Sequence, residues 1–318
     1  MPVINSSDFP YTIRNYQSAD FGDFVRLNIE AEELEPTGRC ISPEAIAERL
    51  GRPHYSPAQD LFLVEKGGGL VGYMDLVPEL TIGRVILDGW VHPEHRRRGL
   101  ATRLLGYAIP RIQELGAKVA HVNIAEDNLV AQRVLSKLGF ERVRRFLELR
   151  LDLARLHCLG GDQEALPCCH LQPGEEEKLA QIQNRSFAGS WGYNLDTVEA
   201  ITYRTSLSHC SPEDVVLTCD GDRIVGYCWA GVTGGGGAAR DEKEGRIFML
   251  GVDPDYRGRG IGRGVLRAGL DYLRSKGLRV AWLTVDSENK VACALYLSLG
   301  FELKSSRLWY EKVIGQDS

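Results

Sequence analysis

Two segments of the chain combine arginine and glycine at a spacing suited to binding phosphate groups. Each begins after a Val-x-Pro sequence, at Val91 and at Val252, where a predicted strand ends and a predicted helix follows. Glycine lets the backbone approach a ligand closely, and the unpaired N–H groups of a helix N-terminus attract a pyrophosphate. The residues predicted to bind it are Arg96, Arg97, Arg98, Gly99, Leu100 and Ala101 in the first segment, and Arg257, Gly258, Arg259, Gly260, Ile261, Gly262 and Arg263 in the second.

Two better-known phosphate motifs do not match these segments. The Gly-x-Gly-x-x-Gly fingerprint of dinucleotide-binding proteins is absent, as is an acidic residue about 20 positions later for a ribose. A Walker loop requires Gly-Lys-Ser or Gly-Lys-Thr, which neither segment contains. The loops are therefore predicted to bind the pyrophosphate of a ligand that is recognised by neither of these two motifs.

The two segments belong to an internal repeat. Val91 aligns with Val252 at an offset of 161 residues, and the same offset brings Asn128 over Asn289 and Phe140 over Phe301. Residues 70–73 also match residues 224–227 at a smaller offset of 154, with the difference absorbed by a glycine-rich insertion at 234–237. Several matches in the same order indicate two related domains in tandem.

Each half is predicted to contain the same elements. A helical opening is followed by two strands, a third strand, the arginine-glycine loop, a helix, a strand, a short helix and a closing strand. The predicted α/β domains are residues 1–151 and 171–318, joined by a linker over 152–170. The opening helices are expected at 19–33 and 175–186, and the strands before the loops at 84–91 and 246–252.

Composition narrows the class of protein. A net charge of −5 over 318 residues gives no reason to expect nucleic acid or an anionic membrane as a partner. No apolar run approaches the roughly 20 residues that span a bilayer, and residues 1–11 do not have the pattern of a secretory signal. Eight scattered cysteines favour a reducing, cytoplasmic location. The His and Cys residues at 157–170 fit no zinc spacing, so no metal site is predicted.

Both halves resemble the GCN5-related N-acetyltransferase (GNAT) family, whose motif is Arg/Gln-x-x-Gly-x-Gly/Ala after a strand, with a downstream Asn and Tyr-x-x-x-Gly-Phe. The second half carries that last sequence from Tyr296 to Phe301. The resemblance implies, for each half, a mixed and mostly antiparallel sheet flanked by helices. It also implies acetyl-CoA as cofactor, held by both loops together with Val91 and Asn128 in the first half and Leu250, Gly251, Val252 and Asn289 in the second.

The resemblance implies direct transfer of the acetyl group to an amine. Backbone N–H groups at 250–252 would polarise the thioester, and Tyr296 would give a proton to the departing thiolate. Helical spacing places Asn289 and Tyr296 on one face of a helix. In the first half the matching position is Leu135, which carries no proton. The second half is therefore predicted to be catalytic, and the first to bind CoA weakly or to serve as scaffold.

The general base is less well defined. The second half most resembles the mycothiol synthase branch of the family, which acetylates a cysteinyl pseudo-disaccharide and has a Glu on the strand before the loop. Arg246 occupies that position here. The catalytic carboxylate is assigned to Glu244, with Glu242 and a water-relayed base as alternatives. Side chains considered for the acceptor pocket are Asn184, Phe187, Trp191 and Tyr193.

The predicted partner is a small-molecule amine of the amino-sugar or cysteinyl-conjugate type. Two alternatives stay open: a non-catalytic acyl-CoA-binding or sensing protein, and an acetyltransferase of peptide or protein amines. The protein is expected to be a monomer or a homodimer.

Overall fold

The computed structural model describes residues 9–39, 41–158, 166–233 and 244–315. The predicted glycine-rich insertion at 234–237, residues 160–162 of the linker and Glu242 lie outside these residues. Among the described residues, no helix is long and apolar enough to cross a membrane.

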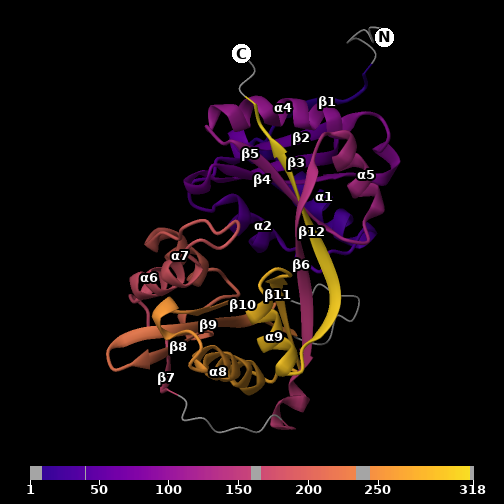
Figure 1. Ribbon diagram of the computed structural model, residues 1–318. Helices are drawn as coiled ribbons and strands as arrows, with labels where there is room; N and C mark the ends of the chain where they lie inside the picture. Colours follow the sequence, from indigo (N-terminus) through magenta and orange to yellow (C-terminus); the bar gives the residue numbers. More distant parts are fainter. Residues whose placement is uncertain (1–8, 40, 159–165, 234–243, 316–318) are drawn as a thin grey trace.

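The described strands form one continuous sheet of twelve, in the order β1-β2-β3-β4-β5-β12-β6-β11-β10-β9-β8-β7 (Figure 1). The strands of the first half are β1 (Thr12–Asn15), β2 (Leu61–Lys66), β3 (Gly69–Glu79), β4 (Arg84–Val91), β5 (Val119–Ala125) and β6 (Glu141–Asp152). Those of the second half are β7 (Cys168–His170), β8 (Val215–Asp220), β9 (Arg223–Thr233), β10 (Glu244–Val252), β11 (Val280–Asp286) and β12 (Glu302–Val313). Most neighbouring pairs are antiparallel; β4–β5 and β10–β11 are parallel. This confirms the predicted fold class.

Helices cover both faces of the sheet. Those of the first half are α1 (Phe21–Leu34), α2 (Pro43–Leu50), α3 (Pro57–Asp60), α4 (Leu100–Glu114) and α5 (Leu129–Lys137). Those of the second half are α6 (Glu176–Phe187), α7 (Val198–Thr205), α8 (Ile261–Ser275) and α9 (Lys290–Ser298). The N-cap residues of α4 and α8 are Gly99 and Gly260, both in the left-handed region with φ of 78° and 80°. Neither supplies a side-chain cap, which leaves the first backbone N–H groups of each helix without a side-chain acceptor from the cap.

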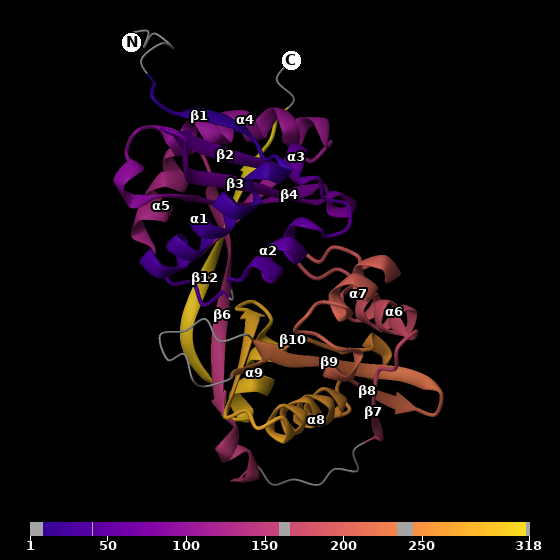
Figure 2. The ribbon, with the colours of Figure 1, turned by 180° about the vertical axis from the view of Figure 1, so that it is seen from behind.

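The closing strands are exchanged between the halves. β12, from the second half, lies between β5 and β6, and β6, from the first half, pairs with β11. Figures 1 and 2 show both strands running between the upper and lower parts of the molecule. The bounds of β6 and β12 differ by the repeat offset of 161, so equivalent strands have traded places.

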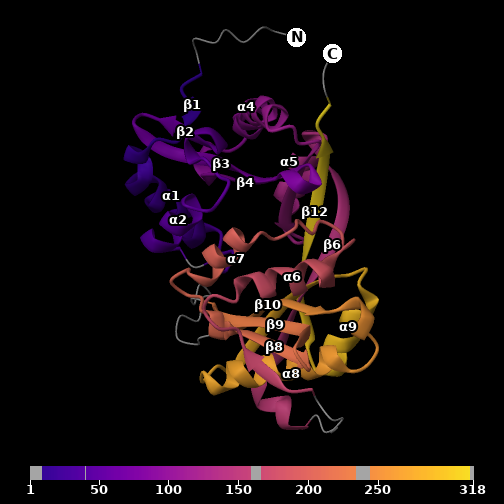
Figure 3. The ribbon, with the colours of Figure 1, turned by 90° about the vertical axis from the view of Figure 1, so that its left-hand side faces the viewer.

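The hydrophobic core follows this exchange. Leu308 and Tyr310 of β12 pack with Leu104 of α4 in the first half, whereas Leu149 of β6 packs with Leu266 of α8 in the second. We call the sheet face under α4, α5, α8 and α9 the α4/α8 face. The opposite face, under α1, α2, α6 and α7, is the α1/α6 face. Figure 3 shows α1 and α2 across β3 and β4 from α4 and α5.

The segment predicted as a linker contains ordered elements at both ends. A 3-10 helix, η5 (Leu153–Cys158), follows β6 directly, and Leu153 and Leu156 enter the second-half core. At its other end β7 pairs with β8 at the edge of the sheet. The chain therefore remains packed on the second-half core after β6 ends.

Candidate active site

The predicted phosphate loop of the first half opens onto a cavity of about 630 Å³. The cavity lies between the ends of β4 and β5 and the helices α4 and α5, and its lining is largely apolar, including Leu87, Leu104 and Phe140. The sequence-predicted residues that line it are Val91, Arg96, Arg97, Gly99, Leu100, Ala101 and Asn128. A charged rim on an apolar channel can hold a pyrophosphate at one end and an uncharged arm within.

The first arginine of each loop is engaged by the protein itself. Arg96 donates to the carbonyl of Val91 at 2.9 Å and forms a two-pronged ion pair with Glu35, whose carboxylate also accepts from the Trp90 indole at 2.8 Å. Arg257 donates to the carbonyls of Ser186 at 2.7 Å and Val252 at 3.4 Å.

Both arginines therefore fasten the end of the strand to the end of the opening helix. Arg98 and Arg259 donate to equivalent carbonyls, those of Glu94 and Asp255. Arg263 donates to the Ser298 hydroxyl at 2.7 Å. Their predicted contacts with a pyrophosphate remain predictions.

The paired strands that precede the loops separate as they approach them. β4 and β5 are paired from Arg84 to Leu87, and β10 and β11 are paired only from Gly245 to Ile247. Beyond these points the two strands of each pair are no longer paired with each other, and we call the unpaired stretch between them the gap of that half. Leu250, Gly251 and Val252 stay paired with β9 along one edge of the second gap.

A β-bulge distinguishes the second gap from the first. The pairing of β10 with β9 shifts between Ile247 and Met249, so Phe248 is an extra residue, whereas β4 pairs with β3 without a shift. A bulge leaves a residue out of the hydrogen-bond ladder and re-aims its backbone groups. Of the two described gaps, only the second therefore has a bulge where its strands stop pairing, and the bulge turns backbone groups out of the regular hydrogen-bond ladder.

Tyr296 belongs to α9, and its side chain points into the core on the α4/α8 face, together with residues of α8. Its ring is buried and packs edge-on against Phe301, with centroids 5.8 Å apart. Burial raises the pKa of the phenol, so it remains protonated over the physiological range. Leu135, its repeat equivalent, lines the first-half cavity. Asn289 and Asn128 are the N-caps of α9 and α5, accepting from the N–H groups of Ala292 and Ala131.

The residues considered for an acceptor pocket separate into two groups. Tyr193 stacks on Phe187 with centroids 5.2 Å apart and donates to Asn184 at 2.8 Å, beside α6. Trp191 instead extends onto the first half, where it packs against Trp309 and His121.

The loop between α6 and α7, residues 188–197, carries Trp191, and we call it the Trp191 loop. It covers the first half on the α1/α6 face. Trp191 contacts rings from β5, β6 and β12, and the guanidinium of Arg84 stacks over it while donating to the carbonyl of Gly192 at 2.7 Å. Burial and the charge of Arg84 lower the pKa of His121 to about 4, which keeps this imidazole neutral at physiological pH. A loop of the second half thus covers the α1/α6 face of the first half.

Glu244 is the first residue of β10 and is half-buried. Gly245 and Ile247 point toward α8, so Glu244 and Arg246 alternate to the α1/α6 face. Glu244 stands three residues before the last paired residue, about 10 Å at the rise of a strand. Arg246 donates to the Thr284 hydroxyl at 2.6 Å.

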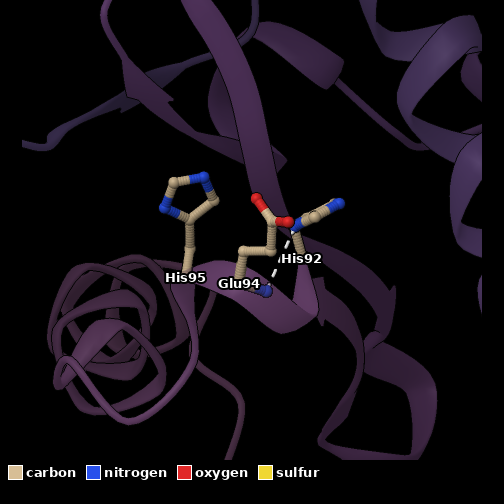
Figure 4. Close-up of side chains that lie close together, drawn as sticks. All are labelled: His92, Glu94 and His95. Carbon is tan, nitrogen blue, oxygen red and sulfur yellow. Dashed lines mark hydrogen bonds between the residues drawn. The ribbon is translucent and has the colours of Figure 1, made fainter.

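A possible metal-binding group precedes the first loop. His92, Glu94 and His95 offer ligand atoms within 4.8 Å of one another (Figure 4). His95 Nδ1 pairs with the Tyr11 hydroxyl, and burial together with the charge of Lys66 lowers the pKa of His95. The same positive surroundings oppose a cation, and the second half has Asp253, Asp255 and Tyr256 at the equivalent positions.

Comparison with known proteins identifies the family. The model of the "Acetyltransferase (GNAT) family" matches residues 26–140 and again residues 177–301. The chain belongs to the GNAT family. A mycothiol acetyltransferase of Actinosynnema mirum is 30% identical over 286 residues, covering 88% of this chain and 91% of that protein. One of Thermobifida fusca is 32% identical over 241 residues, covering 70% and 73%.

Solved GNAT structures share the whole tandem fold. A GCN5-related N-acetyltransferase of Sphaerobacter thermophilus superposes with a TM-score of 0.72 at 24% identity, covering 96% of each chain. A tandem GNAT protein of the clavulanic acid biosynthesis pathway has a TM-score of 0.71 at 17% identity, covering 97% of this chain and 100% of that one. This chain is thus a GNAT acetyltransferase, an enzyme of acyl transfer to amines, and the GNAT fold uses acetyl-CoA or another acyl-CoA as co-substrate.

Some features of this GNAT site are not evident from sequence motifs. The bulge at Phe248, the Glu35 partner of Arg96 and the covering Trp191 all depend on tertiary contacts. At two further positions the sequence repeat does show a difference between the halves. The offset of 161 aligns Glu148 of β6 with Trp309 of β12, so the two closing strands carry a carboxylate and an indole at equivalent positions.

Proposed function

We propose that this protein transfers the acetyl group of acetyl-CoA to the primary amine of a small molecule, and that the transfer takes place in the gap between β10 and β11. The observation that carries the assignment to the second half is the Trp191 loop. It occupies the α1/α6 face of the first half, the side from which an amine would reach a thioester threaded in from the α4/α8 face.

Tyr296 supports the same assignment. It lies on the α4/α8 face, the side of the phosphate loop, where the CoA sulfur would enter. Its raised pKa keeps it protonated and able to donate to a thiolate as the C–S bond breaks. The bulge at Phe248 would supply backbone N–H groups to the carbonyl oxygen of the thioester. The first half has Leu135 and an unbulged strand at these places.

The first half is proposed to bind a CoA thioester without turning it over. Its cavity joins the predicted phosphate loop to an apolar channel, and Leu135 in that channel has no proton to give a leaving thiolate. The role would be to stabilise the fold that both halves share, since ligand binding to the native state adds stability.

The acceptor is proposed to be an amino sugar or a cysteinyl conjugate, on the strength of the mycothiol acetyltransferases that match most of the chain. The mycothiol synthase branch is expected to carry a Glu at the position of Arg246. This difference favours, as a second candidate, an acceptor amine that differs from the one used by those enzymes. The Arg246 guanidinium lies on the α1/α6 face, which favours an amine that also bears an anionic group.

Release of CoA in the presence of defined amines tests the proposal. Suitable acceptors are D-glucosamine, S-methyl-L-cysteine and an S-methylcysteinyl glucosamine conjugate, because S-methylation leaves CoA as the only free thiol produced. We expect turnover with at least one of them. Acetyl-CoA binding without acetylation of any of these amines or of a lysine peptide would instead support an acyl-CoA sensor.

Substituting the proposed acid tests the location of the chemistry. Tyr296→Phe is expected to lower kcat about 100-fold while leaving the KM for acetyl-CoA within a factor of about three, since it removes a proton donor. Because the raised pKa keeps the phenol protonated, wild-type kcat should not decline on the alkaline side near pH 10, as it would for an ordinary tyrosine acid. Leu135→Ala is the matched first-half control and should retain kcat. Full turnover by Tyr296→Phe would contradict the assignment.

A further inference from the structure

We infer that Glu148, contributed by the first half through the exchanged strand β6, binds the acceptor ammonium at the second-half site and receives its proton. This inference rests on the proposed function. It assigns the general base to a residue that lies outside the sequence segment of the catalytic half.

The register of the sheet places Glu148 beside the open gap. β10 and β11 are last paired at Ile247 and Leu283, so Thr284 is the first residue of β11 that borders the gap. Glu148 is the cross-strand partner of Thr284 on the other side of β11. Directly opposed residues in an antiparallel pair have Cβ atoms about 5 Å apart, so the carboxylate is one strand from the gap.

The face is the one that an acceptor would use. Leu147, Leu149 and Leu151 alternate into the core under α8, which directs Glu148 to the α1/α6 face. Tyr296 lies on the opposite face. An acid and a base on opposite sides of the gap suit a thioester whose sulfur enters from one side and whose carbonyl is attacked from the other.

Among the residues that the structure describes, none forms an ion pair with Glu148 within 4.0 Å; the nearest guanidinium on β10, that of Arg246, donates to Thr284. Glu148 is half-buried and accepts a hydrogen bond from the Ser305 hydroxyl. Arg307 lies near enough for the charge of Glu148 to raise its pKa against the lowering effect of burial, yet it donates to Asn123. The charged groups that act on Arg307 at this face are Glu148, Arg39, Asp88 and Arg246.

The first half supplies an internal comparison. There β12 replaces β6, and the residue opposite Asn123, the equivalent of Thr284, is Trp309. Trp191 packs on that indole and covers the position. A carboxylate therefore occurs beside the gap that carries Tyr296 and Phe248, and an indole packed against Trp191 occurs at the equivalent position beside the other. Glu244, by comparison, stands about 10 Å back along β10 at the paired end.

The proton balance is complete with these two groups. The ammonium gives one proton to Glu148, directly or through a water molecule, and the amine nitrogen attacks the thioester carbon. The C–S bond breaks and the thiolate takes the Tyr296 proton. The new amide nitrogen loses its second proton, which restores Tyr296, and Glu148 releases its proton to solvent.

Glu148→Gln tests this role with S-methylcysteinyl glucosamine as the acceptor. We expect kcat/KM for the amine to fall about 100-fold at pH 7, with an unchanged KM for acetyl-CoA. It should recover about six- to tenfold by pH 9.5, because the free fraction of an α-amine with a pKa of about 7.7–8.0 rises by that factor. Glu148→Asp should retain activity within about tenfold. The control Glu302→Gln, on the exposed start of β12, should match wild type.

Three results would overturn the inference: activity of Glu148→Gln within threefold of wild type, an equal loss at every pH, or the predicted pH-dependent loss in Glu244→Gln instead. Amine binding to the CoA-saturated protein, measured by calorimetry, gives a readout that needs no turnover. It should weaken at least tenfold in Glu148→Gln, and equal binding also overturns the inference. If wild type acetylates no amine but binds this one through Glu148, the proposed function fails and the binding role stands.

Discussion

The two predicted phosphate loops differ at one residue whose backbone conformation is costly. Arg97 has a φ of 61°, in the left-handed region, and its repeat equivalent Gly258 has a φ of 77°. A side chain in that region costs roughly 1–2 kcal/mol, whereas glycine avoids the strain and gives back about 0.5–1 kcal/mol in backbone entropy. Arg97 also lines the cavity, so we infer that the strain is retained for ligand binding by the first half.

Arg97→Gly is expected to stabilise the protein by about 0.5–1 kcal/mol and to weaken CoA binding by the first half. The reverse substitution, Gly258→Arg, should destabilise by about 1 kcal/mol through backbone strain, since a Cβ at Gly258 would meet no atom within 4 Å. Urea unfolding measures the first effect and calorimetric stoichiometry of CoA binding the second. A destabilised Arg97→Gly variant would show that the arginine side chain contributes more than its backbone costs.

At the scale of elements, the bulge in β10 is the clearest difference between the two gaps. It inserts Phe248 between Ile247 and Met249, and β4 shows that the same strand can be built without it. Residues on either side of the bulge already alternate correctly, since Ile247 and Leu250 contact the α8 core and Met249 the α6 core. Removing the inserted residue therefore preserves the faces of the strand.

Deletion of Phe248 is expected to leave the protein folded and able to bind CoA while lowering kcat at least 100-fold, because a backbone donor to the thioester oxygen is lost. Circular dichroism, CoA affinity and single-turnover acetylation distinguish these effects. Deletion of Leu87 in β4, which shifts a strand that has no bulge, serves as the comparison and should destabilise the first half. Retained turnover without Phe248 would rule out the bulge as the source of that donor.

Much of the fold follows from local sequence. The opening helices and the strands before the loops lie close to where periodicity predicted them, and helices follow the arginine-glycine loops as predicted. The partners of the closing strands were not predictable, because β6 and β12 are repeats of each other and either would fit beside β5. For the same reason Trp191 and Glu148, whose surroundings come from the other half, could not be placed from motifs.

For the whole molecule, the strand exchange means that each hydrophobic core is completed by residues from both halves. Leu308 and Tyr310 belong to the first core, and Leu149, Leu151 and Leu153 to the second. Removing a buried leucine typically costs 2–5 kcal/mol, so the loss of a whole strand exceeds the stability of an ordinary domain.

Fragments 1–158 and 166–318 are accordingly expected not to fold cooperatively as separate monomers and to recover structure and acetyl transfer when they are co-expressed. Denaturant unfolding and size-exclusion chromatography of each fragment and of the mixture check this. A monomeric fragment 1–158 with a cooperative transition would show that β6 can close its own half. The intact chain, diluted under the same conditions, is the reference.

The same exchange sets a schedule for synthesis on the ribosome. The first sheet needs β12, whose residues are made 161 positions after those of β6. At a translation rate of about 5–20 residues per second, that interval is roughly 10–30 seconds. Throughout it the free edge of β5 and the apolar side chains under α4 await a strand that has not yet been made, and β6 is the nearest substitute. The nascent chain is therefore a natural client for a chaperone that shields open sheet edges.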